Sequence, residues 1–473
     1  MKKPAVFLDR DGTLIEDVGF IRDVARVEFY PDTIEALRRL RDFALFIVTN
    51  QSGIAKGLIS ADEAHGINQF VVQHLAEAGI TIQAVYCCPH ERADGCECIK
   101  PNPYFPRIAE RDFGIDLTRS YVVGDHPSDA ELADRVGAKG IYVLTGHGLK
   151  HREELPADRT IVAGIEEASA AIVRSHAASL LNAGGVVAFP TETVYGLGAD
   201  ASNEAAVRRV FRIKGRPENH PLIVHIADAD MMTEWAVDLP NAAIRLAERF
   251  WPGPLTLIVP KSSRVPDIVT GGQASVGLRV PSHPLALALL KEFGGGIAAP
   301  SANRFGLVSP TTAEHVRRDL GDDVDYVVDG GACDVGLEST IVDLTSDRPG
   351  ILRPGGVTQE EIEATLGYKV PVAMTSDVRV SGQLKTHYAP RAAVVLAPQN
   401  ELEQRARELQ TMGHEVRILS PTDLEPQNLF ASLRRADDEG AAFILASAPE
   451  GQGLGLAVAD RLQKAAAPRD SAD

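Results

Sequence analysis

Residues 5–14 read AVFLDRDGTL, an apolar run that leads directly into two aspartates and a glycine. Such a run, closed by polar and turn-forming residues, predicts a buried strand. Further runs of this kind are ALFIVTN (44–50), VYCC (85–88), YVVGD (121–125) and IYVLTG (141–146). After the first strand, PDTIEALRRLRDF begins with a proline and places Ile34, Leu37 and Leu40 on one helical face. Strands that alternate with helices predict βαβ units and a parallel sheet.

The length and composition of the chain limit what kind of protein it is. Its 473 residues correspond to about three domains of ~150 residues. A hydrophobic content of 44% and a charged content of 24% are typical of a globular protein. No apolar run reaches the ~20 residues of a membrane helix, and Asp9, Arg10 and Asp11 interrupt the N-terminal stretch before it resembles a signal peptide. We therefore expect a cytoplasmic protein without membrane association.

The charge and the cysteines limit the partners. The net charge is −17, from 65 acidic and 48 basic residues. This excess argues against a broad nucleic-acid-binding surface, although it leaves room for a small basic site for a nucleotide. Four of the five cysteines lie between residues 87 and 98, which indicates metal binding rather than disulfides. We expect Cys87 to lie in a strand and Cys333 in a core or a loop.

Changes along the sequence in glycine content and in the length of the apolar runs predict three α/β domains. Residues 1–165 carry the parallel sheet of a Rossmann-like domain, of which residues from about 150 onward look like a connection to the next part. Glycine-rich turns and short mixed strands over 170–375 predict a second α/β domain. A linker over 376–390 precedes a small C-terminal Rossmann-like α/β domain over 391–473, with AVVLA, EVRILS and AAFILASA as strands. We interpret GQGLGLAVADRL near the end as a loop entering the last helix rather than a dinucleotide-binding turn.

Polar residues follow the predicted parallel strands at their carboxyl ends, where open α/β sheets bind ligands. They are Asp9 and Asp11 in FLDRDGT, Thr49 in VTNQSG, Lys100 in CIKPNP, and Asp125 with Asp129 in GDHPSD. One carboxylate can attack phosphorus while a second protonates the leaving oxygen. Thr49 and Lys100 can hold the phosphoryl oxygens, and Asp125 with Asp9 can bind Mg²⁺. The alternative is that D-x-D-G is only a turn and Lys100 a surface charge.

These motifs resemble the haloacid dehalogenase superfamily of phosphatases. FLDRDGTL, VTNQSGIAKG, CPHERADGCECIKP and VGDHPSDAELA are similar to its histidinol phosphate and heptose bisphosphate phosphatase branch, over about residues 1–155. The resemblance implies that Asp9 is the nucleophile and Asp11 the acid/base. It also implies phosphate contacts by Thr49, Asn50 and Lys100, and magnesium contacts by Asp9, Asp11 (through its carbonyl) and Asp125. The implied substrate is a small phosphorylated metabolite of the sugar phosphate or histidinol phosphate type.

The sequence departs from this branch on the substrate side. Ile99 stands where arginine usually precedes the lysine, and His126 stands where lysine usually follows the aspartate. Pro103 and Tyr104 alter the usual KPxPG ending. We therefore predict phosphatase activity but assign no particular metabolite.

A second candidate metal site lies in the same region. Cys88, His90, Cys96 and Cys98 offer three thiolates and one imidazole at close spacing, enough for a closed tetrahedral zinc site. Such a zinc ion would be structural, because no coordination position stays open for a substrate. The family resemblance supports a zinc loop here. The alternative is a set of reduced cysteines beside a surface histidine.

Between residues 175 and 360 several segments combine basic residues with Ser, Thr and Asn, as an anionic nucleotide pocket requires. They are FPTETVYGLG, FRIKGRPENHPLIVHI, SVGLRVPSH, APSANRFGLVSPT, LESTIVD and ILRPGG. Lys214 and Arg216 can face one pocket, although a K-x-R pair by itself is more often a solvated face. From residue 175 onward, these strings closely resemble the threonylcarbamoyl-AMP synthase family, in its long form with a YrdC-like domain and a C-terminal domain.

The resemblance implies condensation of L-threonine, bicarbonate and ATP to threonylcarbamoyl-adenylate and pyrophosphate. The product would pass to a separate transferase that forms threonylcarbamoyladenosine in tRNA. The implied threonine contacts are Thr193, His225, Arg279, Ala299 and Ser339. The implied ATP contacts are Lys214, Arg216, His220, Ser275, Ser301, Asn303, Ser309 and Arg353, with His387 and Tyr388 from the linker. His220 stands where asparagine is also common.

Elementary chemistry agrees with these roles. The guanidinium of Arg279 suits a carboxylate, and Lys214 with Arg216 can stabilise charge while a carbamate attacks the α-phosphorus. Because a carbamate is labile in water, we expect SGQLKTHYAP to cover the site. The alternative is an RNA-binding module joined to a catalytically silent phosphatase-like scaffold, against which stand the acidic net charge and an aromatic content of only 5%.

Overall fold

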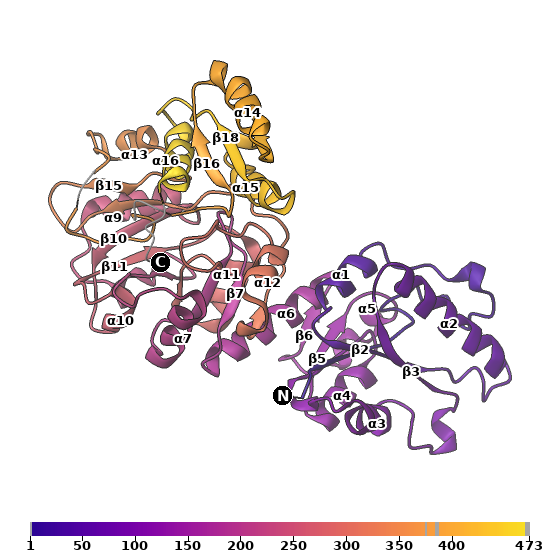
Figure 1. The fold of residues 1–473 in the computed structure, drawn as a ribbon. Helices are drawn as coiled ribbons and strands as arrows, with labels where there is room; N and C mark the ends of the chain where they lie inside the picture. The colour runs from indigo at the N-terminus through magenta and orange to yellow at the C-terminus, as the bar shows by residue number, and fades with distance from the viewer. Residues whose placement is uncertain (1, 374–375, 384–386, 469–473) are drawn as a thin grey trace. The chain divides into compact units, whose positions relative to one another are not determined.

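The computed structural model describes residues 2–373, 376–383 and 387–468 of the chain. It divides into two compact units, Met1–His176 and Ala177–Asp473. Both units are mixtures of helices and sheets, in agreement with the predicted α/β class (Figure 1). Within the described ranges, no helix has the length and apolar character needed to cross a membrane.

The first unit is built on a six-stranded sheet in the order β3-β2-β1-β4-β5-β6, in which every neighbouring pair is parallel. Its strands are β1 (Ala5–Leu8), β2 (Ala44–Asn50), β3 (Ile82–Cys88), β4 (Tyr121–Gly124), β5 (Lys139–Val143) and β6 (Thr160–Val162). Its helices are α1 (Thr33–Arg39), α2 (Ala61–Glu77), α3 (Tyr104–Phe113), α4 (Pro127–Val136), α5 (Gly148–His151) and α6 (Ile165–Asn182), which continues into the second unit.

The central strands of this sheet are buried on both faces, which explains their continuous apolar runs. All four residues of β1 are fully buried. On one face Phe7 stacks on Phe46 at 5.3 Å between ring centroids, and α3 and α4 pack there through Ala109 and Leu132. The stretch from about 150 to 170, which the sequence predicts as a connection between units, also contains β6, which extends the sheet. β6 has only three residues, all at least partly exposed, and so lacked a detectable pattern.

The second unit contains a nine-stranded mixed sheet in the order β13-β7-β8-β12-β9-β11-β10-β14-β15. Its strands are β7 (Val187–Phe189), β8 (Gly196–Asp200), β9 (Ile223–His225), β10 (Leu255–Pro260), β11 (Ser275–Arg279), β12 (Ile297–Ala299), β13 (Tyr326–Val327), β14 (Thr340–Asp343) and β15 (Gly350–Arg353). Its helices are α7 (Glu204–Lys214), α8 (Met232–Trp235), α9 (Asn241–Phe250), α10 (Asp267–Thr270), α11 (Pro284–Phe293), α12 (Ala313–Leu320) and α13 (Gln359–Leu366).

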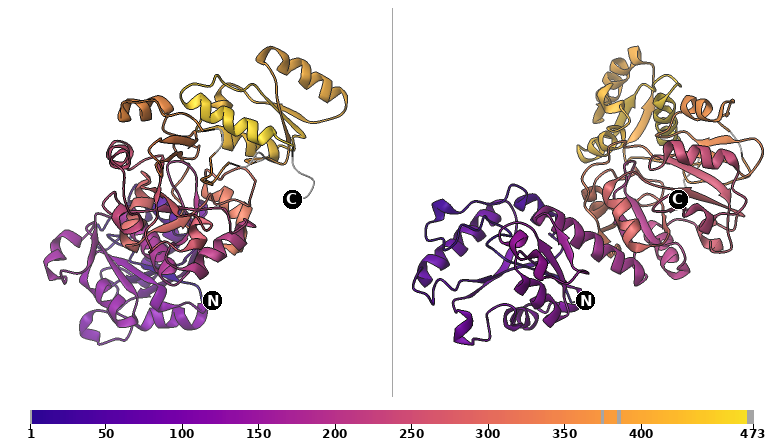
Figure 2. Two further views of the ribbon diagram at one scale, coloured as in Figure 1. Left: turned by 90° about the vertical axis from the view of Figure 1, so that its left-hand side faces the viewer. Right: turned by 180° about the vertical axis from the view of Figure 1, so that it is seen from behind.

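A small three-stranded parallel sheet in the order β16-β18-β17 completes this unit. Its elements are β16 (Ala393–Leu396), α14 (Leu402–Thr411), β17 (Val416–Ile418), α15 (Leu429–Asp438), β18 (Phe443–Ala446) and α16 (Leu454–Ala466). Successive residues of β18 enter different cores. Ile444 packs with α15 and α16, whereas Leu445 packs with α14, so helices cover both faces of the sheet (Figure 2). The glycine-spaced segment enters α16 at Gly453, as predicted from the sequence.

Candidate active sites

In the first unit, the predicted phosphatase residues meet at the carboxyl ends of β1, β2 and β4. Asp9 follows β1 and Asp125 follows β4, and these two strands are paired in parallel. Lys100 is buried, with its Nζ 2.7 Å from Asp9 Oδ1 and 2.7 Å from Asp129 Oδ1. The backbone N–H of Lys100 donates to Asn50 Oδ1 at 3.1 Å. The fold therefore brings together four motifs that are far apart in sequence.

The carboxylate of Asp11 is fixed by a polar network. Arg10, which is 1% exposed, donates to both Asp11 oxygens at 2.9–3.2 Å. Gln51 Nε2 lies 2.8 Å from Asp11 Oδ2 and 2.8 Å from Thr49 Oγ1. Sequence reasoning assigned no role to Arg10 or Gln51, although both lie within the quoted motifs. Position 12 requires glycine for two reasons. Its φ is 77°, and a Cβ there would lie only 2.1 Å from Asp125 Oδ2.

The electrostatics of this site favour a cation. Carboxylate oxygens of Asp9, Asp125 and Asp129 lie within 4.8 Å of one another. Burial raises the pKa of Asp9, and burial together with the nearby Asp9 raises the pKa of Asp125 to about 8. Burial alone would lower the pKa of Lys100, but Asp129 and Asp9 raise it above its ordinary value. One lysine cannot balance three carboxylates, so this donor set fits a hard divalent cation.

The four predicted zinc ligands form a compact cluster. The sulfur atoms of Cys88, Cys96 and Cys98 lie 3.2–3.7 Å apart, and Nδ1 of His90 lies 3.8 Å from Cys88 Sγ and 3.4 Å from Cys98 Sγ. Tetrahedral bonds of ~2.3 Å place sulfur ligands roughly 3.7 Å apart. The donor set thus fits zinc in both chemistry and size. Cys87 lies in β3 outside this cluster, and Cys333 is buried in a loop, as expected.

The substrate side of this site is lined differently from the family pattern. His126 caps α4, with its Nδ1 3.0 Å from Ser128 Oγ, and its ring lies 4.9 Å from that of His151. Burial and the charge of His151 lower the pKa of His126. A largely neutral imidazole therefore stands where the branch has a lysine. Tyr104 is 42% exposed at the start of α3.

In the second unit, one cavity gathers all five residues implied to bind threonine: Thr193, His225, Arg279, Ala299 and Ser339. The strands place them. His225 and Arg279 end the parallel neighbours β9 and β11 and are directly paired in register. Ala299 ends β12, and Ser339 precedes β14. Burial, followed by the charge of Arg279, lowers the pKa of His225 to about 3, so its imidazole is neutral.

Arg279 already has a buried partner that the sequence analysis did not assign. Its guanidinium lies 2.7 Å from Glu192 Oε1, and both side chains are about 5% exposed. Glu192 also accepts a hydrogen bond from the backbone N–H of Ser282 at 3.0 Å. Glu192 therefore fixes the guanidinium at the cavity wall. Its sequence signal is weak, since Glu192 is simply the one charged residue of the segment FPTETVYGLG.

Lys214 and Arg216 reach the same cavity because α7 ends between them. Asn203 caps the helix start, and Gly215 closes its end with a φ of 66°. Lys214 Nζ donates to the carbonyls of Ser301 at 2.5 Å and Asn303 at 2.6 Å. Burial lowers the pKa of Lys214 well below its ordinary value, and lowers that of Arg216 to about 10.

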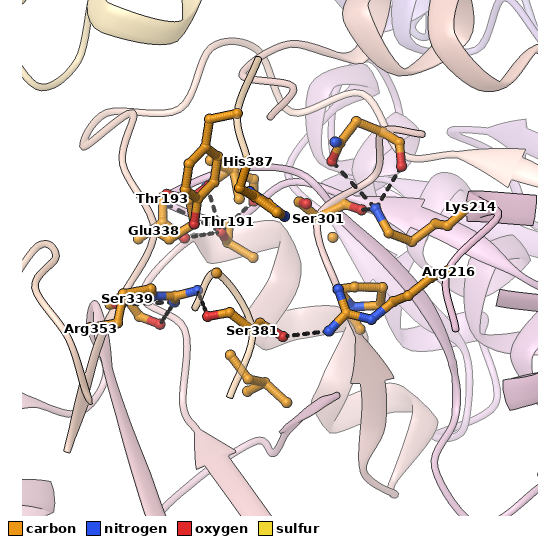
Figure 3. A pocket seen from close by; sticks show the side chains of 18 of the residues that line it. Thr191, Thr193, Lys214, Arg216, Ser301, Glu338, Ser339, Arg353, Ser381 and His387 are labelled. Atoms are coloured by element: carbon orange, nitrogen blue, oxygen red, sulfur yellow. Dashed lines mark hydrogen bonds between the residues drawn. The ribbon is translucent and has the colours of Figure 1, made fainter. Parts of the chain in front are cut away.

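The linker contributes residues to the cavity. Ser381, Gly382, His387 and Tyr388 line it, while residues 384–386 of SGQLKTHYAP lie outside the described residues. Ser381 connects two cationic groups, since its carbonyl accepts from Arg353 and its Oγ accepts from Arg216, both at 3.1 Å (Figure 3).

Three predicted ATP contacts do not line this cavity. His220 packs edge-on against Phe305, a lining residue, at 5.5 Å. Ser275 lines an adjoining pocket that shares Ile223 and Ser381 with the main one. Ser309 is fully buried and donates at 2.6 Å to Glu338, which does line the cavity.

Comparison with known proteins identifies the family of the second unit. Residues 179–355 match the family model described as telomere recombination, and residues 357–467 match the C-terminal domain of threonylcarbamoyl-AMP synthase. The threonylcarbamoyl-AMP synthase of Pyrococcus abyssi is 42% identical over 318 residues, covering 62% of this chain and 94% of that protein. The chain belongs to the threonylcarbamoyl-AMP synthase family. A crystal structure of P. abyssi Sua5 in complex with L-threonine has a similar fold, with a TM-score of 0.58 and 40% sequence identity. The match covers 63% of this chain and 94% of the Sua5 chain.

This threonylcarbamoyl-AMP synthase family member carries an additional N-terminal unit. Residues 97–168 match a model described as HAD-hydrolase-like. The D-glycero-β-D-manno-heptose-1,7-bisphosphate 7-phosphatase of Yersinia pestis is 37% identical over 166 residues, covering 33% of this chain and 88% of that protein. The chain thus joins a haloacid-dehalogenase-like phosphatase unit to a threonylcarbamoyl-AMP synthase region.

Proposed function

We propose that the chain is a bifunctional cytoplasmic enzyme. Its second unit forms threonylcarbamoyl-adenylate from L-threonine, bicarbonate and ATP, for tRNA modification by a separate transferase. Its first unit hydrolyses a phosphomonoester of a small metabolite with the help of Mg²⁺. The observation that carries the synthase activity is a single cavity in the second unit. This cavity is lined by the five implied threonine contacts together with Lys214, Arg216 and Arg353.

The geometry supports a sequence of steps for the adenylate reaction. The Arg279 guanidinium holds the threonine carboxylate, and the neutral amine takes up carbon from bicarbonate to give a carbamate and water. A carbamate oxygen then attacks the α-phosphorus of ATP, and the bond to pyrophosphate breaks. Lys214 and Arg216 stabilise the charge that develops on the phosphoryl oxygens. Linker residues such as His387 limit access of water to the labile carbamate.

This activity is tested by pyrophosphate release from purified protein. We expect release only when ATP, threonine and bicarbonate are all present. Lys214→Ala should reduce kcat/KM by roughly 100-fold or more, because a buried cation aimed at the transition state is lost. The pocket is misassigned if the variant and the wild type release pyrophosphate at the same rate.

In the first unit, Asp9 attacks the phosphorus to form an aspartyl-phosphate while Asp11 protonates the leaving oxygen. Water then releases inorganic phosphate, with Asp11 acting as the base. Thr49 and Lys100 hold the phosphoryl oxygens. A magnesium ion held by Asp9 and Asp125, with the Asp11 carbonyl that the family resemblance implies, would offset the charge repulsion between the carboxylates and the substrate.

The substrate is identified by screening phosphorylated metabolites with the full chain and measuring phosphate release. Sugar phosphates, sugar bisphosphates and histidinol phosphate form the core of the screen. We expect phosphate release to require Mg²⁺. We also expect the order of preferred substrates to differ from that of the phosphatase branch, because Ile99 and His126 stand where that branch has cationic side chains. Absence of release from every compound would contradict a phosphatase.

A further inference from the structure

The last helix of the chain inserts a fully buried arginine beside the synthase cavity. Arg461 of α16 is 0% exposed, and its Nε donates at 2.9 Å to Glu338, which is itself buried. Glu338 lines the cavity (Figure 3). The other oxygen of Glu338 accepts from Ser309 Oγ at 2.6 Å. Although burial raises the pKa of Glu338, the charges of Arg461 and Arg353 lower it below its ordinary value. The carboxylate is therefore ionised and fixed from both sides.

Arg461 also supports the linker. Its guanidinium lies over the ring of Tyr388 at 5.1 Å and donates to the carbonyl of Pro354 at 3.0 Å. Tyr388 is 1% exposed and has a φ of 60°, a left-handed conformation that is strained for a bulky residue and persists only where the surroundings impose it. Phe430 of α15 stacks on the same ring at 5.5 Å.

One turn further along α16, Lys464 holds two more linker residues. Its Nζ donates to the Gly382 carbonyl at 2.6 Å, and its own carbonyl accepts from the His387 backbone N–H at 3.3 Å. Gly382, His387 and Tyr388 all line the cavity. Helix α16 therefore contacts both the wall of the cavity and the linker.

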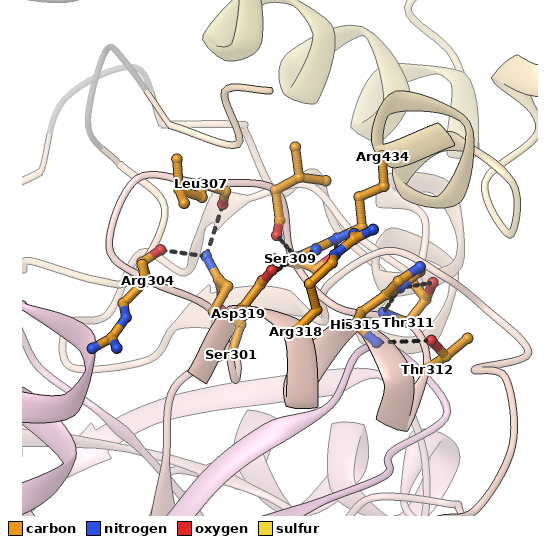
Figure 4. Close-up of polar contacts among 12 residues, drawn as sticks. Ser301, Arg304, Leu307, Ser309, Thr311, Thr312, His315, Arg318, Asp319 and Arg434 are labelled. Carbon is orange, nitrogen blue, oxygen red and sulfur yellow. Dashed lines mark hydrogen bonds and ion pairs between the residues drawn. The ribbon is translucent and has the colours of Figure 1, made fainter. Parts of the chain in front are cut away.

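A second buried arginine approaches Ser309 from the other side. Arg434 of α15 pairs with Asp319 at 2.6 Å and donates to the carbonyls of Val308 and, at 3.3 Å, Ser309 (Figure 4). The Arg434 and Asp319 side chains are only 6% and 12% exposed. Ser309 is thus held by its backbone through Arg434 and by its hydroxyl through Glu338 and Arg461.

We propose that Arg461 and Arg434 are positioning residues for the synthase reaction, which fix Ser309, Glu338 and Tyr388 in the arrangement that receives ATP. Burying a charged pair is costly, and replacing both partners together by apolar residues of similar size is often no less stable. Simple docking of the C-terminal domain therefore does not require two such arginines. Two arginines are needed where side chains must be held by hydrogen bonds of defined direction, because a planar guanidinium donates in fixed directions. This inference rests on the proposed synthase function.

The test compares Arg461→Met and Arg434→Met, which keep side-chain volume, with Arg461→Lys and with Arg318→Ala. Arg318 pairs with Asp438 of the C-terminal domain at 2.6 Å, but both side chains are over 40% exposed. Arg318→Ala therefore removes a contact to the C-terminal domain without touching the cavity. For each variant, the Tm and the kcat and KM for ATP and for threonine are measured in the adenylate assay.

We expect Arg461→Met and Arg434→Met to raise KM for ATP at least tenfold and to change KM for threonine less than threefold. Each variant also leaves a buried carboxylate without its partner, so its Tm should fall further than that of Arg318→Ala. Arg461→Lys should not restore the affinity, because lysine lacks the planar fork. Glu338→Gln combined with Arg461→Met should be no worse than Arg461→Met alone, since both act through Ser309.

The positioning role is overturned if Arg461→Met folds and its KM for ATP stays within twofold of that of Arg318→Ala. It is also overturned if the effects of Glu338→Gln and Arg461→Met multiply. Should Arg461→Met fail to fold, the same criteria apply to Arg461→Lys. If instead the wild type forms no adenylate, the proposed synthase function itself fails, and this outcome is separate from active variants with unchanged KM.

Discussion

At the scale of single residues, the buried lysines of the two sites have opposite electrostatic environments. Lys100 lies between Asp9 and Asp129, which raise its pKa, so the cation is already matched by carboxylates. Lys214 instead donates to carbonyl oxygens, and burial lowers its pKa. A cation without a carboxylate partner at contact distance gains most from an anionic ligand. This difference suits the two proposed activities, a phosphatase assisted by a metal ion and a synthase that binds a nucleotide.

Replacement of the proposed nucleophile should stop the phosphatase reaction. Asp9→Asn should lower the rate of phosphate release by more than about 1,000-fold, because the amide cannot form the aspartyl-phosphate. The measurement is phosphate release from the best substrate of the metabolite screen. Asp158→Asn, at an exposed position of the same unit, should match the wild type. Residual activity of Asp9→Asn near the wild-type rate would exclude the covalent mechanism.

A partly buried histidine, His315, should make the second unit sensitive to acid. Burial, together with Arg434 and Arg318, lowers the pKa of His315 to about 4. The unfolded chain binds a proton near pH 6.5 and the folded one only near pH 4, so the histidine's contribution to stability is complete above pH 6.5 and is lost as the pH falls toward 4. Because the ring is partly exposed and solvent screens its charge, we expect it to account for about 1 kcal/mol of the free energy of unfolding between pH 7.5 and 5.

The measurement for this prediction is urea unfolding at the two pH values. His315→Gln keeps a hydrogen-bond acceptor near Thr311 but cannot titrate, so we expect it to lose less stability on acidification than the wild type. Equal losses in both proteins would show that His315 does not contribute.

At the scale of elements, sequence patterns located most strands of the two parallel sheets but not every one. The strands β1, β2 and β4 were predictable because each is a buried apolar run that ends in a polar site residue. The strand β6 was not, because TIV is too short and too exposed for a pattern. The sequence also did not predict the contacts made by three site residues, Glu192, Glu338 and Ser381. Their roles depend on partners that are distant in sequence, such as Arg279 and Arg461, and no spacing rule connects them.

The loop after β3 should depend on zinc for its order. Cys98→Ser removes one of the four clustered ligands, and we expect a lower zinc content and a Tm of the first unit lower by several degrees, equivalent to about 2 kcal/mol. Cys87→Ser is the matched control, since Cys87 neighbours the cluster without belonging to it. The expectation fails if the wild type binds no zinc or if both variants show the same Tm.

At the scale of the whole molecule, the residues assigned to each proposed site fall within one unit of the chain. The phosphatase site uses residues of Met1–His176, and the synthase cavity uses residues of Ala177–Asp473. What the two activities share is the chain, in which α6 runs from one unit into the next.

This separation predicts independent inactivation. In the full-length protein, Asp9→Asn should leave pyrophosphate release within about twofold of the wild type, and Lys214→Ala should do the same for phosphate release. Both reactions are measured on the same preparations. A variant that loses both activities while keeping its Tm would show that the sites are coupled.

The central claim is that the cavity of the second unit directs a threonine-derived carbamate to the α-phosphorus of ATP. The most direct measurement is phosphorus NMR of a reaction containing ATP, threonine and ¹³C-bicarbonate, followed by mass spectrometry of the product. Attack at the α-phosphorus predicts pyrophosphate together with an adenylate that carries one ¹³C atom, and neither should form with Lys214→Ala. Formation of ADP and phosphate instead, or of an adenylate without the label, would contradict the claim.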